Sequence, residues 1–104
     1  MTDKIDKRVV WNVVDSNGKH YRYHFYCPAC KTIHGFNFSW SFDQNYFRPT
    51  VSPSLLITRG HLDPKYRCHL YIRGGKIEYL RDCSHDLAGK MVDMVTADHW
   101  YKKI

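Results

Sequence analysis

Alternation of hydrophobic and polar residues is clearest between residues 35 and 42 of the chain. Aromatic side chains occupy every second position there and would share one side of a strand, with small polar residues on the other. The aromatic positions are Phe36, Phe38, Trp40 and Phe42, and the polar ones are Asn37, Ser39 and Ser41. We therefore predict a single extended strand with an aromatic core face over residues 35–42.

A β-hairpin is predicted before this strand, where residues 9–15 and 20–26 flank an Asn17-Gly18 turn. The Asn-Gly pair tolerates the positive φ angles of a type I′ turn. Carrying that register outward places Val10 opposite Phe25 and Asn12 opposite Tyr23.

A second hairpin is predicted between residues 67 and 82, with a Gly74-Gly75 turn and Arg73 opposite Lys76. In that register one face is apolar and carries two thiols, whereas the other is basic and wet. The apolar face holds Cys68, Leu70, Ile72, Ile77, Tyr79, Arg81 and Cys83. The wet face holds Arg67, His69, Tyr71, Lys76, Glu78 and Leu80.

The remaining segments carry weaker patterns. Residues 48–54 contain two prolines, which donate no ladder hydrogen bonds, so this segment should run extended at a sheet edge or as a crossing loop, before a short strand over residues 55–58. Its hydroxyls at Thr50, Ser52 and Ser54 line a polar groove or satisfy nearby backbone groups; we favour the second and assign no nucleophile. Residues 84–89 predict one helical turn capped by Ser84 and ended by Gly89, and residues 90–104 fit a strand or a short helix.

Composition favours one small folded domain spanning residues 1–104. The chain has 104 residues, of which 43% are hydrophobic and 15% aromatic, which excludes a disordered chain and a large two-domain enzyme. Its apolar stretches are too short to span a membrane, and its first residues do not form a secretory signal, so we expect a cytoplasmic protein. The expected fold is mainly β, with a small α+β variant as the alternative.

The four cysteines predict a zinc site. Cys27-Pro-Ala-Cys30 has the spacing of a zinc knuckle, and the register of the second hairpin brings Cys68 and Cys83 to one face of its open end. We therefore expect Cys27, Cys30, Cys68 and Cys83 to hold Zn2+ and to join two β-elements as in a zinc ribbon. His34 and His85 are alternative ligands or hydrogen-bond neighbours of the ligands, whereas His69 should point away from the thiols. Disulfides, a redox dithiol and unligated cysteines remain alternatives.

The chain carries a net charge of +6, which favours an acidic macromolecular partner. The residues expected to form a basic, aromatic binding surface are Arg22, Tyr23, Arg67, Tyr71, Arg73 and Lys76. The partner would be another protein or a nucleic acid, and neither a membrane nor a small-molecule substrate is indicated.

Two functional hypotheses follow from these residues. The preferred one is a non-enzymatic, zinc-stabilised binding protein. The other is a small zinc-dependent hydrolase with an open metal site, using His34 or His85 and Asp82 or Asp86.

Several blocks of residues resemble an uncharacterised family of short phage and bacterial proteins with zinc-knuckle-like cysteines, some of which are labelled ammonia monooxygenase. The resemblance covers about residues 23–93. The matching blocks are Tyr26-Cys27-Pro28-Ala29-Cys30 with His34, Trp40-Ser41-Phe42, Arg48-Pro49-Thr50-Val51-Ser52-Pro53-Ser54, Cys68-His69, and the run from Asp82 to Gly89. It implies a zinc-bound phage or prophage accessory protein without an assigned activity, whose partner would be a host or phage protein. A membrane copper monooxygenase would need membrane spans that this sequence lacks.

Overall fold

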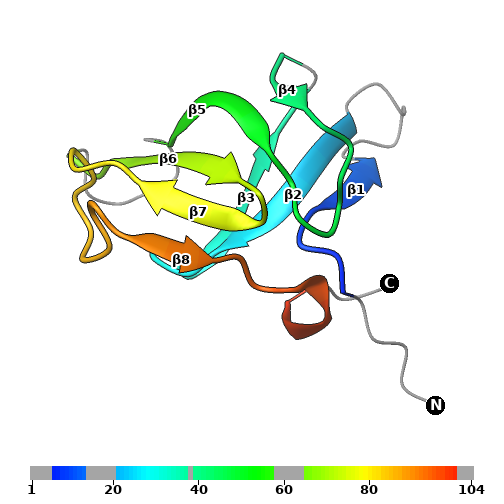
Figure 1. Cartoon of the computed structure of the whole chain (residues 1–104). Helices are drawn as coiled ribbons and strands as arrows, with labels where there is room; N and C mark the ends of the chain where they lie inside the picture. Colours follow the sequence, from blue (N-terminus) through cyan, green and yellow to red (C-terminus); the bar gives the residue numbers. More distant parts are fainter. Residues whose placement is uncertain (1–5, 14–20, 38, 58–64, 101–104) are drawn as a thin grey trace.

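Two antiparallel β-sheets face each other across the hydrophobic core in the computed structural model of the chain (Figure 1). The structure describes residues 6–13, 21–37, 39–57 and 65–100. The first sheet has the order β1 (Val10–Val13), β2 (Tyr21–Cys27) and β3 (Thr32–Phe36). The second has the order β4 (Ser41–Phe42), β5 (Val51–Ile57), β6 (Cys68–Arg73), β7 (Lys76–Tyr79) and β8 (Met91–Asp93). A 3-10 turn, η1 (Ala97–His99), follows, and the mainly β fold is confirmed.

The second hairpin has the predicted register, with Arg73 opposite Lys76 across the glycine turn. Both turn glycines have positive φ angles, +56° at Gly74 and +81° at Gly75. The expected apolar face is buried from Cys68 through Ile72 on β6. The second arm is shorter than predicted, because β7 ends at Tyr79 and the chain then turns. Cys83 therefore leaves the regular pairing on which its predicted position depended.

The predicted register of the first hairpin is wrong by one residue. Val10 pairs with His24, and Trp11 pairs with Tyr23. Tyr23 and Phe25 of β2 do face the core as expected, and Val9, which directly precedes β1, is fully buried. The Asn17-Gly18 turn lies outside the described residues.

The aromatic segment is not one continuous strand. β3 ends at Phe36, and Asn37 then forms a turn, because its side-chain oxygen accepts a hydrogen bond from Ser39 N (2.9 Å) and its carbonyl accepts one from Trp40 N (3.2 Å). Phe36 therefore belongs to the first sheet and Phe42 to the second. Their rings still meet edge to face in the core, 5.7 Å apart. Alternation correctly predicted that both rings pack in the core, but the expected single strand is wrong, because the two residues lie on different sheets.

The proline-containing segment runs extended, as predicted, but not at a sheet edge or as a crossing loop, because it leads into β5, which lies between β4 and β6. Its pairing with β6 is irregular: Val51 lies opposite Ile72, whereas Leu55 lies opposite Leu70. Residues 52–54 therefore bulge out opposite the single residue Tyr71. Bulges of this kind redirect side chains beside functional sites, and this one carries Ser54.

The segment after β7 contains turns where one helical turn was predicted. Gly89 has a φ of +77°, and Ala88 N donates to His85 O (3.2 Å). Ser84 does not cap a helix; its hydroxyl instead accepts a hydrogen bond from Arg67 N (2.8 Å). Among the described residues, no helix is long and apolar enough to cross a membrane.

Truncating a core residue of β6 should cost far more stability than truncating an exposed residue of β5. Leu70 is fully buried, whereas Leu56 is 55% exposed. We expect Leu70→Ala to lower the free energy of unfolding by about 2–5 kcal/mol, because the lost packing leaves a cavity between the sheets. Leu56→Ala should change it by about 0.5 kcal/mol or less. Urea denaturation of the two variants followed by tryptophan fluorescence checks this, and equal losses would contradict the assigned core.

Candidate functional site

A chain of hydrogen bonds joins three side chains on the outer face of the second sheet. Ser54 Oγ lies 2.9 Å from His69 Nε2. On the other side of the same ring, His69 Nδ1 lies 3.1 and 3.2 Å from the two carboxylate oxygens of Asp82. A serine, a histidine and an aspartate in this order can activate the serine hydroxyl as a nucleophile.

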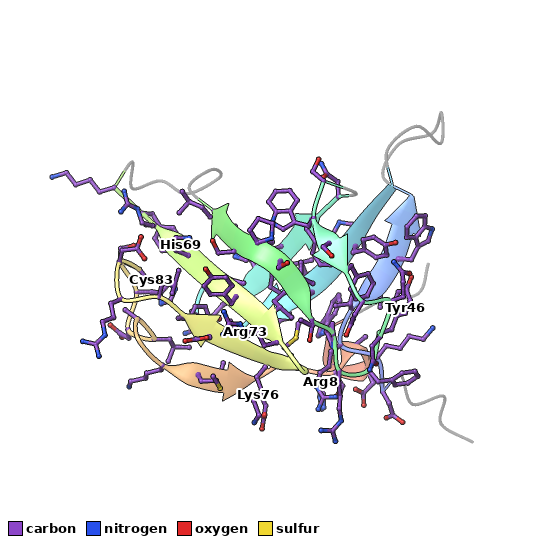
Figure 2. All side chains as sticks on the ribbon, turned by 45° about the horizontal axis from the view of Figure 1, so that its top comes forward. Arg8, Tyr46, His69, Arg73, Lys76 and Cys83 are labelled. Carbon is purple, nitrogen blue, oxygen red and sulfur yellow. The ribbon has the colours of Figure 1, made fainter. Side chains whose placement is uncertain are left out.

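Each member of this serine–histidine–aspartate chain comes from a different segment. Ser54 is aimed by the bulge in β5, and His69 is the second residue of β6, next to Cys68. Asp82 comes from the turn that follows β7. Because side chains alternate along a strand, His69 faces outward while Cys68 faces the core. Figure 2 shows His69 and Cys83 near each other at one end of the second sheet.

The charge on Asp82 determines which nitrogen of the His69 ring carries the proton. The hydrogen bond from His69 lowers the pKa of the Asp82 carboxyl below its usual value, and the charges of His69 and Arg67 act in the same direction. The Arg67 guanidinium lies 3.6 Å from Asp82 Oδ2. An ionised carboxylate only accepts hydrogen bonds, so His69 Nδ1 must carry the proton. His69 Nε2 is then free to accept the proton of Ser54, as a general base requires.

The backbone beside the nucleophile is also held in place. The indole nitrogen of Trp40 donates to the carbonyl oxygen of Ser54 (3.4 Å). Ser54 is half-buried, and the side chains of His69 and Asp82 are 24% and 43% exposed. The backbone of Ser54 is thus held by a hydrogen bond from the protein interior, while the exposed sides of His69 and Asp82 remain accessible to a substrate.

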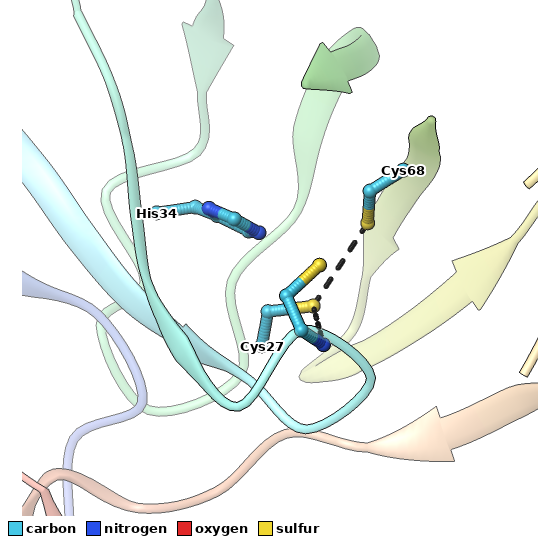
Figure 3. Close-up of side chains that lie close together, drawn as sticks. Cys27, His34 and Cys68 are labelled. Carbon is cyan, nitrogen blue, oxygen red and sulfur yellow. Dashed lines mark hydrogen bonds between the residues drawn. The ribbon is translucent and has the colours of Figure 1, made fainter. Parts of the chain in front are cut away.

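A second group of reactive side chains lies on the opposite, core-facing side of β6. The sulfurs of Cys27, Cys30 and Cys68 and a ring nitrogen of His34 all lie within 4.8 Å of one another, and we call this group the Cys3His cluster. Figure 3 shows His34 on β3 and Cys68 on β6 pointing toward Cys27 at the end of β2. Four such donors in tetrahedral array about zinc lie roughly 3.5–4 Å apart, so the Cys3His cluster fits a metal ion.

Two further observations on the Cys3His cluster support a metal. His34 Nε2 is buried and has no hydrogen-bond partner among the described residues, which is costly unless the nitrogen binds something. The sulfurs of Cys27 and Cys68 lie 3.9 Å apart, and all four cysteines of the chain are free. The predicted disulfide alternative is therefore not formed.

The thiols of this cluster share protons unequally. The pKa of Cys27 is lowered to about 3, chiefly because the Cys68 thiol donates to its sulfur, and the Tyr79 hydroxyl contacts the same sulfur at 3.0 Å. The pKa of Cys68 is raised because its proton is held by Cys27. The surroundings of Cys27 therefore favour its thiolate, which is the form of cysteine that binds metal ions.

The donor set differs from the predicted one in a single member. Cys83 was expected as the fourth donor, with His34 as an alternative, but His34 joins the three other cysteines and Cys83 does not. The early end of β7 turns Cys83 toward the backbone of His69 instead. His85 also lies elsewhere: its Nδ1 accepts a hydrogen bond from Leu87 N (3.2 Å), and its ring packs against Tyr79. Asp86 is exposed beside it, in a hollow that it shares with Lys31.

The expected basic, aromatic surface is largely neutralised. Tyr23 is buried and stacks on Phe36, so it belongs to the core rather than to a surface. The Arg22 side chain lies outside what the structure describes. The other expected residues engage partners within the chain: Arg67 pairs with Asp82, Arg73 pairs with Glu78 and covers the Tyr71 ring, and Lys76 pairs with Asp93.

The serine–histidine–aspartate chain was missed at the sequence level, although one signal of it was available. The hairpin register places His69 on the wet face, and Asp82 at the end of the same hairpin. Ser54 could not be added, because the bulge that aims it at His69 has no sequence signature beyond the proline at residue 53.

A family model described as bacterial ubiquitination-like system serine protease (BubE) matches residues 1–80. This range includes Ser54, His69 and every member of the Cys3His cluster, and Asp82 lies just after its end. No curated protein and no solved structure matches the chain. None of these findings supports the phage origin or the ammonia monooxygenase label that the resemblance implied.

Proposed function

Since the chain belongs to the family of bacterial ubiquitination-like system serine proteases (BubE), we propose that it hydrolyses acyl bonds with Ser54 as the nucleophile. His69 is the general base, and Asp82 orients its ring. The observation that carries this proposal is the unbroken hydrogen-bond chain from Ser54 through both nitrogens of His69 to Asp82.

The reaction follows from the protonation states of these groups. Ser54 Oγ attacks the carbonyl carbon of the scissile bond while His69 Nε2 takes the hydroxyl proton, and Asp82 stabilises the imidazolium that forms. The proton on Nε2 passes to the leaving nitrogen, the carbon–nitrogen bond breaks, and an ester to Ser54 remains. Water then attacks this ester while His69 takes one of its protons. His69 returns that proton to Ser54 Oγ as the bond to the serine oxygen breaks and the carboxylic acid departs.

The substrate we propose is a ubiquitin-like protein joined through its C-terminus to a second chain or to a short extension. The family description connects the chain with a ubiquitination-like system, and such a system joins proteins through acyl bonds that a serine protease can cleave. The exposure of His69 and Asp82 on an open sheet face suits an extended, flexible protein terminus better than a small molecule.

For the Cys3His cluster we propose a structural zinc ion. Its four protein donors leave no coordination position for a catalytic water, so the zinc-dependent hydrolase alternative is not favoured. The ion would pin β2 and β3 to β6, on which Cys68 immediately precedes His69. It would thereby hold the strand that carries the general base.

A fluorophosphonate probe tests the assignment of the nucleophile, because it phosphonylates serines that an adjacent base has activated. Ser54 Oγ would attack phosphorus, fluoride would leave, and the proton would pass to His69. We expect one adduct per folded chain, located at Ser54 by tandem mass spectrometry, and none after unfolding in urea. Ser52, two residues away in the same bulge, is the internal control. No adduct, or an adduct at another serine, would contradict the proposed function.

A further inference from the structure

Cys83 is a buried thiol that neither the Cys3His cluster nor the hydrolytic mechanism uses. It is 9% exposed, and its sulfur contacts the main chain of His69 rather than another thiol. We infer that Cys83 is a positioning residue, which holds the backbone of the general base in register with Asp82. This inference rests on the proposed function and adds a residue to it.

The argument starts from the hydrogen bonds of the His69 backbone. His69 lies opposite Leu56 of β5, and its carbonyl accepts a hydrogen bond from Leu80 N (2.9 Å) on its other side. Because β7 ends at Tyr79, no residue of that strand lies beside His69 to accept a hydrogen bond from its N–H. The Cys83 sulfur accepts it at 3.1 Å, and the Cys83 thiol donates to His69 O at 3.1 Å. One side chain thus replaces a missing strand partner with both an acceptor and a donor.

The turn after β7 explains how Cys83 reaches this position. Cys83 N donates to Leu80 O (3.2 Å), which closes the turn. The next residue, Ser84, is tied to the Arg67 backbone by its own N–H (2.9 Å) and by its hydroxyl. Residues 80–84 therefore run along the edge of β6 as an irregular substitute for a strand.

This turn gives Asp82 and Cys83 complementary tasks. The carboxylate of Asp82 holds the His69 ring through Nδ1, while the thiol of Cys83 holds the main chain of the same residue. Adjacent residues thus fix both ends of the histidine. A shift of the His69 backbone would move Nε2 away from Ser54 Oγ, and catalysis is sensitive to displacements of about 1 Å.

A thiol suits this position for a physical reason. Burial raises the pKa of Cys83, so the sulfur keeps its proton and can donate to the carbonyl as well as accept from the N–H. Removing it would leave a buried N–H without an acceptor, which is unfavourable enough for the strand to move.

The test compares Cys83→Val, which fills a similar volume without hydrogen bonds, with Cys83→Ser, which can still donate and accept. We expect Cys83→Val to lower the second-order rate constant for fluorophosphonate labelling of Ser54 by about 10- to 100-fold. Cys83→Ser should recover most of that loss. Both variants should keep one zinc per chain and the circular dichroism spectrum of the wild type.

Three results would overturn the inference. The first is labelling of Cys83→Val within about twofold of the wild type, and the second is labelling of Cys83→Ser as slow as that of a folded Cys83→Val. The third is loss of zinc from Cys83→Ser, which would make Cys83 a metal ligand. If Cys83→Val does not fold, the rate constant and zinc content of Cys83→Ser decide. If the wild type is not labelled, the proposed function itself is contradicted. If the wild type is labelled and Cys83→Val is labelled at the same rate, only the role of Cys83 is contradicted.

Discussion

Hydrolysis should fall by about 10⁶-fold when Ser54 is replaced by alanine. The substrate for this measurement is a ubiquitin-like domain fused through its C-terminus to a reporter peptide, with cleavage followed by mass spectrometry. The loss is this large because Ser54 and His69 act as a unit, and without the hydroxyl His69 has no proton to accept. Binding of the substrate should persist, so the variant should still retain the fusion in a pull-down.

The matched control is Ser52→Ala in the same bulge of β5. Ser52 is exposed and pairs with Ser41 of β4, whereas Ser54 is the serine bonded to His69. We expect the Ser52 variant to keep the wild-type rate within about threefold, since it removes one exposed hydroxyl far from the histidine nitrogen. Equal losses in both variants would point to distortion of the bulge, and unchanged hydrolysis by Ser54→Ala would exclude Ser54 as the nucleophile.

The part of the fold that could be predicted is the part governed by local pattern. The Gly74-Gly75 turn and the alternation around it gave the register of β6 and β7 and the buried position of Cys68. The same alternation correctly separated His69 from Cys68, although it offered no role for His69. Between β1 and β2, by contrast, the predicted register was wrong by one residue.

The candidate site was only half predictable for a different reason. Cys27 and Cys30 are close in sequence, so their spacing alone indicates that they bind one metal ion. The position of Cys68 could be predicted because it lies in a regular strand. Ser54, His69 and Asp82 come from three segments joined by two irregularities, the bulge in β5 and the turn after β7. Each irregularity depends on contacts with the neighbouring strand. Periodicity predicts side-chain directions only in regular strands. Ser54 and Asp82 reach His69 because the backbone is irregular at the bulge in β5 and at the turn after β7.

The neighbouring positions of Cys68 and His69 connect the two sites through a single strand. One faces the Cys3His cluster and the other faces Ser54. A strand fixed by a metal on its inner face is a rigid support for a base on its outer face, and such rigidity is what a preorganised catalytic group requires. In a chain of 104 residues, the core alone supplies limited stability, so the ion would also contribute to folding.

Removing the metal should unfold the protein. Structural zinc sites in small domains contribute roughly 10–16 kcal/mol of apparent binding free energy, whereas a whole domain is stable by only about 5–15 kcal/mol. We therefore expect a strong chelator, or the Cys27→Ser substitution, to abolish the cooperative thermal transition and the labelling of Ser54 together. Metal content by inductively coupled plasma mass spectrometry and melting by circular dichroism measure the two quantities. A chelated, metal-free protein that melts at the wild-type temperature would contradict a structural metal.

Two histidines provide the sharpest control for the donor set, because the sequence left both open as ligands. Nε2 of both histidines is buried without a hydrogen-bond partner among the described residues, but only His34 lies within reach of the three sulfurs, whereas the His85 ring packs against Tyr79. His34→Ala should lose zinc and melt at a lower temperature, while His85→Ala should keep one zinc per chain. If His85→Ala lost zinc and His34→Ala kept it, His85 rather than His34 would be the histidine ligand. Loss of zinc from neither variant would mean that three sulfurs suffice to hold the ion, with water as the fourth ligand, and would reopen the metal-dependent hydrolase alternative.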